Sequence, residues 1–152
     1  LQISPGEARY DIDAYFARYP GIRAYRDRTK EEAKEHGDVL TPFGRRCYVP
    51  GIKDKDGARR SYAERQAINA PLQGGAADII KRAMVRLARK LPETGLKAQM
   101  LLQVHDELLF EVQEQDAQAL ADFVRQEMGS AAKLDVALEV ETGIGPSWAD
   151  AH

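Results

Sequence analysis

The fold is decided by residues 97–112, which read KAQMLLQVHDELLFEV. Two apolar runs, at 100–104 and 108–112, flank a charged triplet at 105–107. Runs this short and this rich in bulky apolar side chains predict buried strands. A two-residue connection between them predicts an antiparallel hairpin, and this connection lacks the glycine that usually eases such a turn.

The tip of the predicted hairpin carries candidate metal ligands. Ordered strands fix the geometry of a carboxylate held at their end, and hard divalent cations such as Mg²⁺ prefer carboxylate oxygens. Asp106 is therefore predicted to bind a metal ion, with Glu107 adding negative charge beside it. A plain solvated turn is the competing interpretation, because most charged turns bind nothing.

The bulk composition is that of a globular protein. The chain has 152 residues, of which 43% are hydrophobic and 30% charged, as is usual for soluble domains. No apolar run approaches the length of a membrane span, so no membrane partner is expected. The lone Cys47 cannot form an internal disulfide, which favours a cytoplasmic location.

The charge is unevenly distributed along the sequence. The net charge of −2 argues against uniform nucleic-acid binding. Residues 41–65 contain seven basic and three acidic side chains, for a net charge of +4, whereas residues 106–152 contain two basic and eleven acidic ones, for a net charge of −9. This separation suits a protein that contacts phosphates on one surface only.

Cap and turn residues divide the rest of the chain into elements. Ser4, Pro5 and Glu7 predict a first helix, because they match a capping box with proline at the first helical position. Pro71 is expected to mark a kink or a junction between two helices. Periodicity predicts the remaining elements: helices over about 22–35, 58–70, 72–91 and 116–128, a hairpin over 39–49, and a strand with one buried face over 134–141.

Three polar residues, Arg65, Asn69 and Gln73, recur at intervals of four and would share one side of a continuous helix. Such a stripe can contact phosphates and minor-groove base edges, but the spacing alone favours an exposed polar face. Gly74 and Gly75 follow directly; they lack the Lys-Ser/Thr ending of a P-loop, so close backbone packing is the better explanation.

Several blocks of sequence resemble the bacterial DNA polymerase I family, also called family A. Residues 103–112, QVHDELLFEV, are similar to the family's third sequence block, in which the Asp is a catalytic metal ligand on the palm hairpin. Residues 57–84 resemble the segment that precedes this hairpin, with matching separation. The shorter matches are residues 15–21, 41–46 and 148–152, so the resemblance covers essentially the whole chain.

The resemblance implies an α+β fold, in which a palm-type antiparallel sheet with a catalytic β-hairpin is packed by helices and preceded by a helical fingers portion. Residues 1–56 would belong to the fingers and residues 57–152 to the palm. The implied activity is DNA-directed DNA polymerisation, used in DNA replication and repair. Nucleotidyl transfer from a dNTP to a primer 3′-hydroxyl would proceed by a two-metal mechanism with Mg²⁺.

Roles for individual residues follow from the same resemblance. Asp106 would be a catalytic metal ligand, and Glu107 a second catalytic carboxylate. Primer-template DNA would be contacted by the positions that match the family's DNA-binding residues, namely Arg65, Asn69, Gln73 and His105. For His105, an ordinary hydrogen-bonded turn histidine is an equal alternative.

The sequence also departs from the family pattern. The block Asp-Tyr-Ser-Gln-Ile-Glu-Leu-Arg, which supplies the family's other catalytic Asp, does not occur, nor does the fingers helix that grips the triphosphate. We therefore expect a C-terminal piece of a polymerase that is inactive without the remainder of the chain. The alternatives are a non-catalytic DNA-binding module and, far less favoured, a metal-dependent phosphohydrolase, for which His36 and His152 supply too few further ligands.

Overall fold

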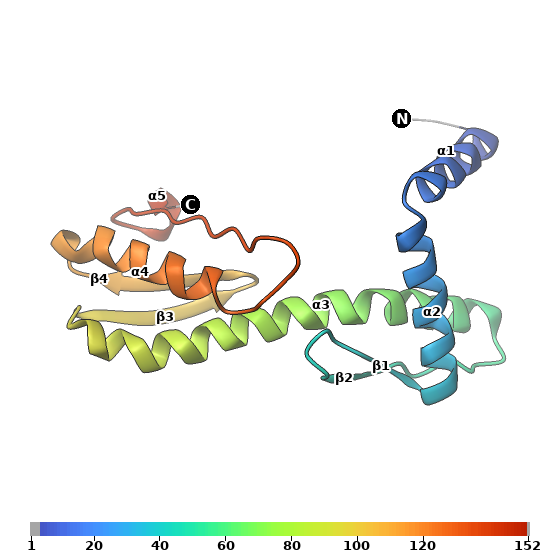
Figure 1. Cartoon of the computed structure of the whole chain (residues 1–152), viewed down its shortest axis with the longest axis horizontal. Coiled ribbons are helices and arrows are strands. Elements are labelled where there is room, and N and C mark those ends of the chain that lie inside the picture. Colours follow the sequence, from blue (N-terminus) through green and yellow to red (C-terminus); the bar gives the residue numbers. More distant parts are fainter. Residues whose placement is uncertain (1–3, 152) are drawn as a thin grey trace. The chain divides into compact units, whose positions relative to one another are not determined.

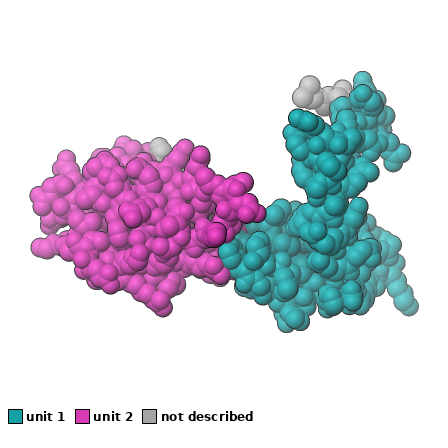
Figure 2. Space-filling view, in the orientation of Figure 1, with its two compact units in different colours: residues 1–75 teal, residues 76–152 magenta. Residues whose placement is uncertain are grey.

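The structure is a computed structural model that describes residues 4–151. Its contacts divide the chain into two compact units, residues 1–75 and residues 76–152 (Figure 2). The long helix α3, Gly57–Lys90, contributes residues to both units (Figure 1). Helices together with two antiparallel hairpins confirm the predicted α+β class. The assignment of fingers and palm on either side of residue 57 stays a prediction.

Unit 1 begins with two helices separated by a single residue. In α1, Pro5–Arg18, the Ser4 hydroxyl accepts the Glu7 N–H, and the Glu7 carboxylate accepts the Ser4 N–H at 2.8 Å, which confirms the capping box. The second helix, α2, Pro20–His36, starts two residues before its predicted start. Proline fits the first position of a helix, where its missing N–H would have no partner.

A small core joins the remaining elements of unit 1. Strands β1, Asp38–Leu40, and β2, Arg46–Tyr48, form the predicted antiparallel hairpin. The hairpin and the loop after it pack against α2 and the first half of α3. The buried core residues are Ala33, Val39, Val49, Ile52, Ala63 and Ala67.

Of the two expectations for Pro71, the junction between two helices is wrong, because α3 continues through the proline as a single helix of 34 residues; the kink stays a prediction. Proline removes one backbone donor and crowds the preceding turn. Here the proline lies on the buried side of the helix, in line with Ala63, Ala67 and Gly75. Packing on that side therefore holds the helix together across the weak point.

Unit 2 is built around the predicted hairpin, which spans residues 98–112. Strands β3, Ala98–Val104, and β4, Glu107–Val112, pair antiparallel, with an irregularity between Met100 and Leu102 that marks a β-bulge. The 3₁₀ turn η1, Leu91–Thr94, leads into β3. The 3₁₀ turn η2, Glu114–Asp116, leads from β4 into α4, Ala117–Gly129.

One face of the hairpin packs against both α3 and α4. The buried centre combines Leu87 from α3 and Leu91 from η1 with Leu120 and Val124 from α4. The half-buried residues around them come mostly from the strands and from α4: Leu96, Ala98, Met100, Leu108, Phe110, Val112, Phe123 and Met128. This face confirms the prediction of strands that bury apolar side chains.

The opposite face of the hairpin is more open than the sequence predicted. Leu101 and Leu102 are 47% and 52% exposed. The prediction of a strand over 134–141 is wrong. Among the described residues this segment pairs with no strand, and its backbone is irregular. Alternation of apolar and polar side chains produces a strand only where a neighbouring strand supplies hydrogen-bond partners for the backbone. The alternating pattern was therefore not enough to predict a strand here. The last element is the short helix α5, Trp148–Ala151.

Candidate functional site

The tip of the β3–β4 hairpin is a constrained two-residue turn. Val104 pairs with Glu107, which leaves His105 and Asp106 as the connection. His105 has φ +52°, and it is the one non-glycine residue with a positive φ among residues 4–151. The side-chain amide of Gln103 donates to the His105 carbonyl and so supports this conformation. Strained backbone of this kind is a reason to look for function.

Two consecutive residues at this tip carry carboxylates. Asp106 and Glu107 are both exposed, and pairing places Glu107 on the open face of the hairpin, beside Val104. Their oxygen donors suit Mg²⁺ or a similar hard cation. Across residues 4–151, however, no group of three or more His, Cys, Asp or Glu side chains is arranged to hold a metal ion. Within the described residues the tip thus brings two carboxylates and no third side chain of these types close enough to complete such a group.

The polar stripe predicted in the sequence lies in unit 1. Because α3 is continuous, Arg65, Asn69 and Gln73 share one side of it, and all three are exposed. A two-residue offset turns a helix by about 200°, which places the stripe opposite the buried line that runs through Ala63 and Ala67. Structure thus brings these three residues together, whereas the hairpin tip belongs to the other unit.

The two glycines after the stripe allow a close approach of the β1–β2 connection. A Cβ on Gly74 would lie 2.7 Å from Thr41 Cγ2, and a Cβ on Gly75 would lie 3.1 Å from Pro42 Cδ. Both glycines lie within α3. The structure therefore confirms that they serve packing and form no phosphate-binding loop.

An ion-pair cluster between α3 and α4 was not predicted from the sequence. The buried carboxylate of Glu127 accepts hydrogen bonds from Lys90 Nζ at 2.7 and 2.9 Å and lies 3.1 Å from Arg86 Nη2. The hydrogen bond from Lys90 holds the pKa of Glu127 below its ordinary value. A signal was present, because Glu127 continues the helical spacing of Leu120 and Val124 on the apolar side of α4. The cluster lies within unit 2 and links α3 to α4 through ion pairs.

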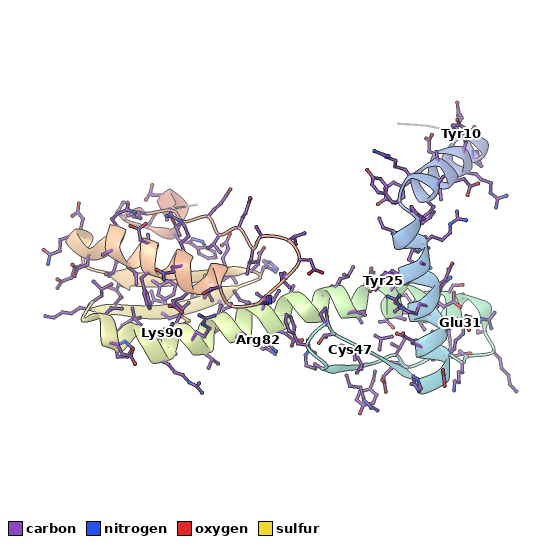
Figure 3. All side chains as sticks on the ribbon, in the orientation of Figure 1. Tyr10, Tyr25, Glu31, Cys47, Arg82 and Lys90 are labelled. Atoms are coloured by element: carbon purple, nitrogen blue, oxygen red, sulfur yellow. The ribbon has the colours of Figure 1, made fainter. Side chains whose placement is uncertain are left out.

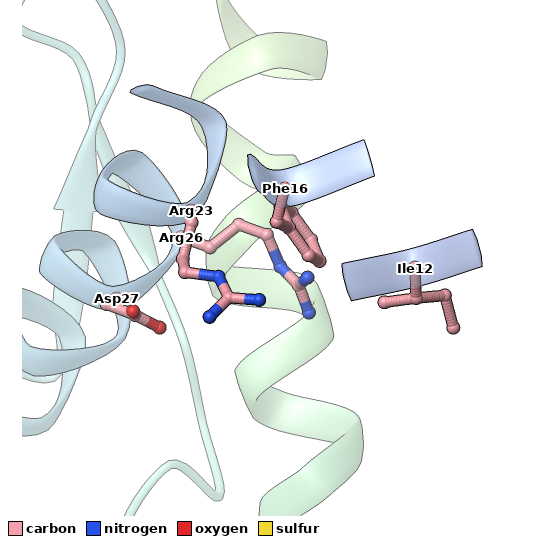
Figure 4. A pocket seen from close by; sticks show the side chains of 5 residues that line it. All are labelled: Ile12, Phe16, Arg23, Arg26 and Asp27. Carbon is pink, nitrogen blue, oxygen red and sulfur yellow. The ribbon is translucent and has the colours of Figure 1, made fainter. Parts of the chain in front are cut away.

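A shallow hollow of about 260 Å³ lies between α1 and α2 (Figure 4). Phe16 in its wall is contacted by the guanidinium groups of Arg23 and Arg26, whose Cζ atoms lie 5.0 and 4.9 Å from the ring centroid. Asp13 pairs with Arg23 at 3.4 Å, and Asp27 lines the same wall. The charges of this hollow thus offset one another, and we assign it no ligand.

Comparison with known proteins identifies the family. The family model described as "DNA polymerase family A" matches residues 1–150, so the chain belongs to DNA polymerase family A. It is 55% identical over 146 residues to DNA polymerase I of Pseudomonas aeruginosa, covering 96% of this chain and 16% of the relative. It is 46% identical over 151 residues to DNA polymerase I of Bacillus subtilis, covering 99% and 17%.

A solved structure agrees with this assignment. The chain matches the "POL domain of Pol1 from M. smegmatis complex with DNA primer-template and dNTP" with a TM-score of 0.92 and 46% identity, covering 98% of this chain and 26% of that one. The chain thus spans about one sixth of the length of the curated relatives it matches. Family A polymerases use divalent metal ions. No helix of the described residues is long and apolar enough to cross a membrane.

Proposed function

We propose that this chain is part of a DNA-directed DNA polymerase that adds dNTPs to a primer 3′-hydroxyl. The observation that carries the proposal is the constrained hairpin tip, which carries Asp106 and Glu107 as consecutive residues in a chain of family A. A solved relative of the same fold holds primer-template DNA and dNTP, which supports both as partners. The bacterial relatives favour action in the cytoplasm, where chromosomal DNA is copied and repaired.

Asp106 would be a ligand of catalytic Mg²⁺, with Glu107 contributing negative charge next to it. When bound, a pair of divalent ions activates the attacking hydroxyl and stabilises the leaving pyrophosphate. The residues themselves hold oxygen donors at the end of a rigid hairpin, so that the ligand geometry is set before substrate arrives. His105 occupies the adjacent turn position and would orient the primer end.

Arg65, Asn69 and Gln73 would contact the primer-template duplex. Minor-groove acceptors, N3 of purines and O2 of pyrimidines, occur in every base pair. Donors spaced along one exposed side of α3 can reach such atoms without reading the sequence, and a guanidinium such as that of Arg65 also suits phosphate oxygens. The stripe would thus favour correctly shaped base pairs.

The proposal requires the remainder of a longer polymerase chain as a partner. The described residues include no group of three or more side chains that could hold a metal ion, and two-metal catalysis at Asp106 would need at least one further carboxylate. The share of each relative that this chain covers, 16% to 17%, is consistent with such a division of the site. We propose that the other catalytic carboxylate and the residues that grip dNTP lie in that remainder.

The test is primer extension by the full-length polymerase that contains this sequence, with Asp106→Asn compared with wild type. Loss of a metal ligand should lower the extension rate by roughly a thousandfold, because metal stabilisation amounts to several kcal/mol. Affinity for primer-template should change by about twofold or less. As a matched control, Glu111→Gln removes an exposed carboxylate from β4, the strand that follows the tip, and should leave extension unchanged.

Two other results would point elsewhere. Unchanged extension by Asp106→Asn would make the tip an ordinary turn and remove the proposed metal site. If extension were also insensitive to Glu107→Gln while Gln73→Ala weakened DNA binding, this segment would be a non-catalytic DNA-binding module.

A further inference from the structure

Two side chains from outside α3 donate hydrogen bonds to its backbone carbonyls. The Tyr25 hydroxyl, from α2, donates to the Ile68 carbonyl at 2.8 Å (Figure 3). Arg45 Nη2, from the connection between β1 and β2, donates to the Gly74 carbonyl at 2.8 Å. All of these residues belong to unit 1. The two carbonyls are six residues apart, which is about 9 Å along a helix.

The helix between these two carbonyls contains both Pro71 and two members of the polar stripe, Asn69 and Gln73. Proline supplies no N–H to the carbonyl four residues earlier, and its ring crowds that carbonyl, so this is where α3 bends most easily. A bend there changes the angle between Asn69 and Gln73, because the two lie on opposite sides of the proline in sequence. Restraints on both sides of the bend therefore fix their relative positions.

Both donors are themselves held in place. Partial burial raises the pKa of Tyr25, so its hydroxyl keeps the proton that it donates, and the Tyr25 carbonyl accepts a hydrogen bond from the Thr29 hydroxyl at 2.8 Å. The Arg45 N–H donates to the hydroxyl of buried Thr41 at 3.1 Å, and the Arg45 carbonyl accepts the Thr41 N–H at 2.9 Å. The missing side chain of Gly74 lets this connection come close enough for the contact.

We propose that Tyr25 and Arg45 are positioning residues, which clamp the backbone of α3 on both sides of Pro71 and so set Asn69 and Gln73 for contact with the primer-template duplex. This inference rests on the proposed function of the stripe. Neither donor needs to touch DNA. Removal of either one should loosen the stripe without removing any group that contacts the duplex.

The test is a double-mutant comparison in the full-length polymerase that contains this sequence. Tyr25→Phe and Arg45→Met are each made in the wild-type background and in a background that carries Asn69→Ala and Gln73→Ala. The readouts are primer-template affinity and extension efficiency from matched and mispaired primer ends. Tyr48→Phe, which removes the hydroxyl of a tyrosine 77% exposed on β2, is the matched control.

In the wild-type background, each clamp variant should lower extension from matched ends by about three- to tenfold, the range for loss of one hydrogen bond. It should also narrow the preference for matched over mispaired ends. In the background without Asn69 and Gln73 the same substitutions should have no further effect. Tyr48→Phe should behave as wild type in both.

Salt dependence tests whether Arg45 acts on the helix or on DNA directly. A clamp on the Gly74 carbonyl predicts that Arg45→Met leaves the slope of log affinity against log salt unchanged. A phosphate contact would instead reduce that slope by about one unit, and this result would overturn the role proposed for Arg45.

The remaining outcomes separate the two proposals. Clamp variants that are silent in the wild-type background, or that are equally harmful in both backgrounds, overturn the clamp while the function of the stripe stands. If the paired alanine substitutions themselves leave affinity and extension unchanged, the proposed DNA contact fails, and the clamp fails with it.

Discussion

At the scale of single residues, His105 combines a strained backbone with a candidate functional side chain. Its φ of +52° lies in the left-handed region, which is unfavourable for L-residues by about 1 kcal/mol or more and is free of that cost for glycine. We predict that His105→Gly keeps the hairpin and changes stability by less than about 1 kcal/mol, with an increase favoured. Thermal unfolding of the full-length polymerase would measure this.

A second substitution distinguishes the effect of losing the imidazole ring from the effect of relieving the backbone strain. His105→Ala removes the imidazole and keeps the strain. If the ring orients the primer end, His105→Gly and His105→Ala should lose extension to the same extent, although only the alanine variant retains the strained backbone. A marked loss of stability in His105→Gly would contradict the argument from strain.

Glu127 provides a pH-dependent contribution to stability. Its pKa is lowered in the folded chain, chiefly by the hydrogen bond from Lys90, so folding favours the ionised form. This contribution is complete above the ordinary pKa of Glu, about 4.3, and is lost as the pH falls through the lowered pKa of the folded state. We predict that Glu127→Gln destabilises the chain by about 2 kcal/mol at pH 7.

The measurement is thermal unfolding of wild type and Glu127→Gln at pH 7 and pH 3. The difference should shrink at the lower pH, because Glu127 in the wild type is then increasingly protonated. As the control, Glu139→Gln removes an exposed carboxylate and should change stability little at either pH. A difference that is equal at both pH values would show that ionisation of Glu127 does not matter.

At the scale of elements, the contact between α3 and the β1–β2 connection depends on glycine. Gly74→Ala would improve helix propensity by about 1 kcal/mol, but its Cβ would lie 2.7 Å from Thr41 Cγ2 and 3.0 Å from Arg45 Nη2. Thr41 is buried and bound through its backbone, so it cannot move away freely. We predict net destabilisation by about 1–3 kcal/mol.

Gly21→Ala is the matched substitution, because Gly21 lies in the first turn of α2 and nothing lies within 4 Å of its added Cβ. It should be neutral or stabilising by a few tenths of a kcal/mol. Chemical denaturation of both variants tests the pair. Equal behaviour of the two variants would contradict the close approach at Gly74.

Most elements could be predicted because their signals are local. The cap at Ser4 and the apolar runs around residues 105–107 each act within a few residues of the chain. The errors arose where the outcome depends on distant partners. Packing on one side carries α3 through Pro71, and the absence of a neighbouring strand among the described residues leaves 134–141 irregular.

The features around the candidate site also fall into local ones, which a sequence pattern can indicate, and contacts between distant residues, which it cannot. Asp106 and Glu107 are neighbours in sequence, and the stripe that includes Asn69 repeats at helical spacing, so the position of each group on its element could be predicted. Their functional roles rest on the family resemblance and stay predictions. The bond from Tyr25 to Ile68 spans 43 residues, and the pair between Lys90 and Glu127 spans 37. Contacts of that range depend on how elements pack, which periodicity within one element does not specify.

At the scale of the whole molecule, the chain alone should be inactive. The hairpin tip supplies Asp106 and Glu107, and the described residues include no cluster of three metal-ligating side chains. One or two exposed carboxylates bind Mg²⁺ weakly, because the ion keeps most of its water unless several ligands converge. We predict no templated extension by the purified 152-residue chain in millimolar Mg²⁺. Detectable incorporation of dNTP by this chain would contradict the prediction.

The open face of the β3–β4 hairpin should make the isolated chain associate with itself. Leu102, 52% exposed, lies there beside half-buried Leu109, and Leu101 at the bulge is 47% exposed. Apolar side chains grouped on a sheet with unpaired edges favour pairing with another copy. We predict concentration-dependent dimers or larger species in sedimentation velocity, reduced by Leu102→Lys, because a charge on this face opposes its burial.

Val136→Lys is the control for this substitution, since Val136 is 73% exposed but lies outside the hairpin. It adds the same charge to the chain and should leave association unchanged. If both variants reduced association equally, net charge rather than the hairpin face would be responsible. A chain that stayed monomeric at all concentrations would mean that this face is stable in water. In the full-length polymerase, Leu102→Lys should instead lower stability, because we expect the remainder of the chain to cover the same face.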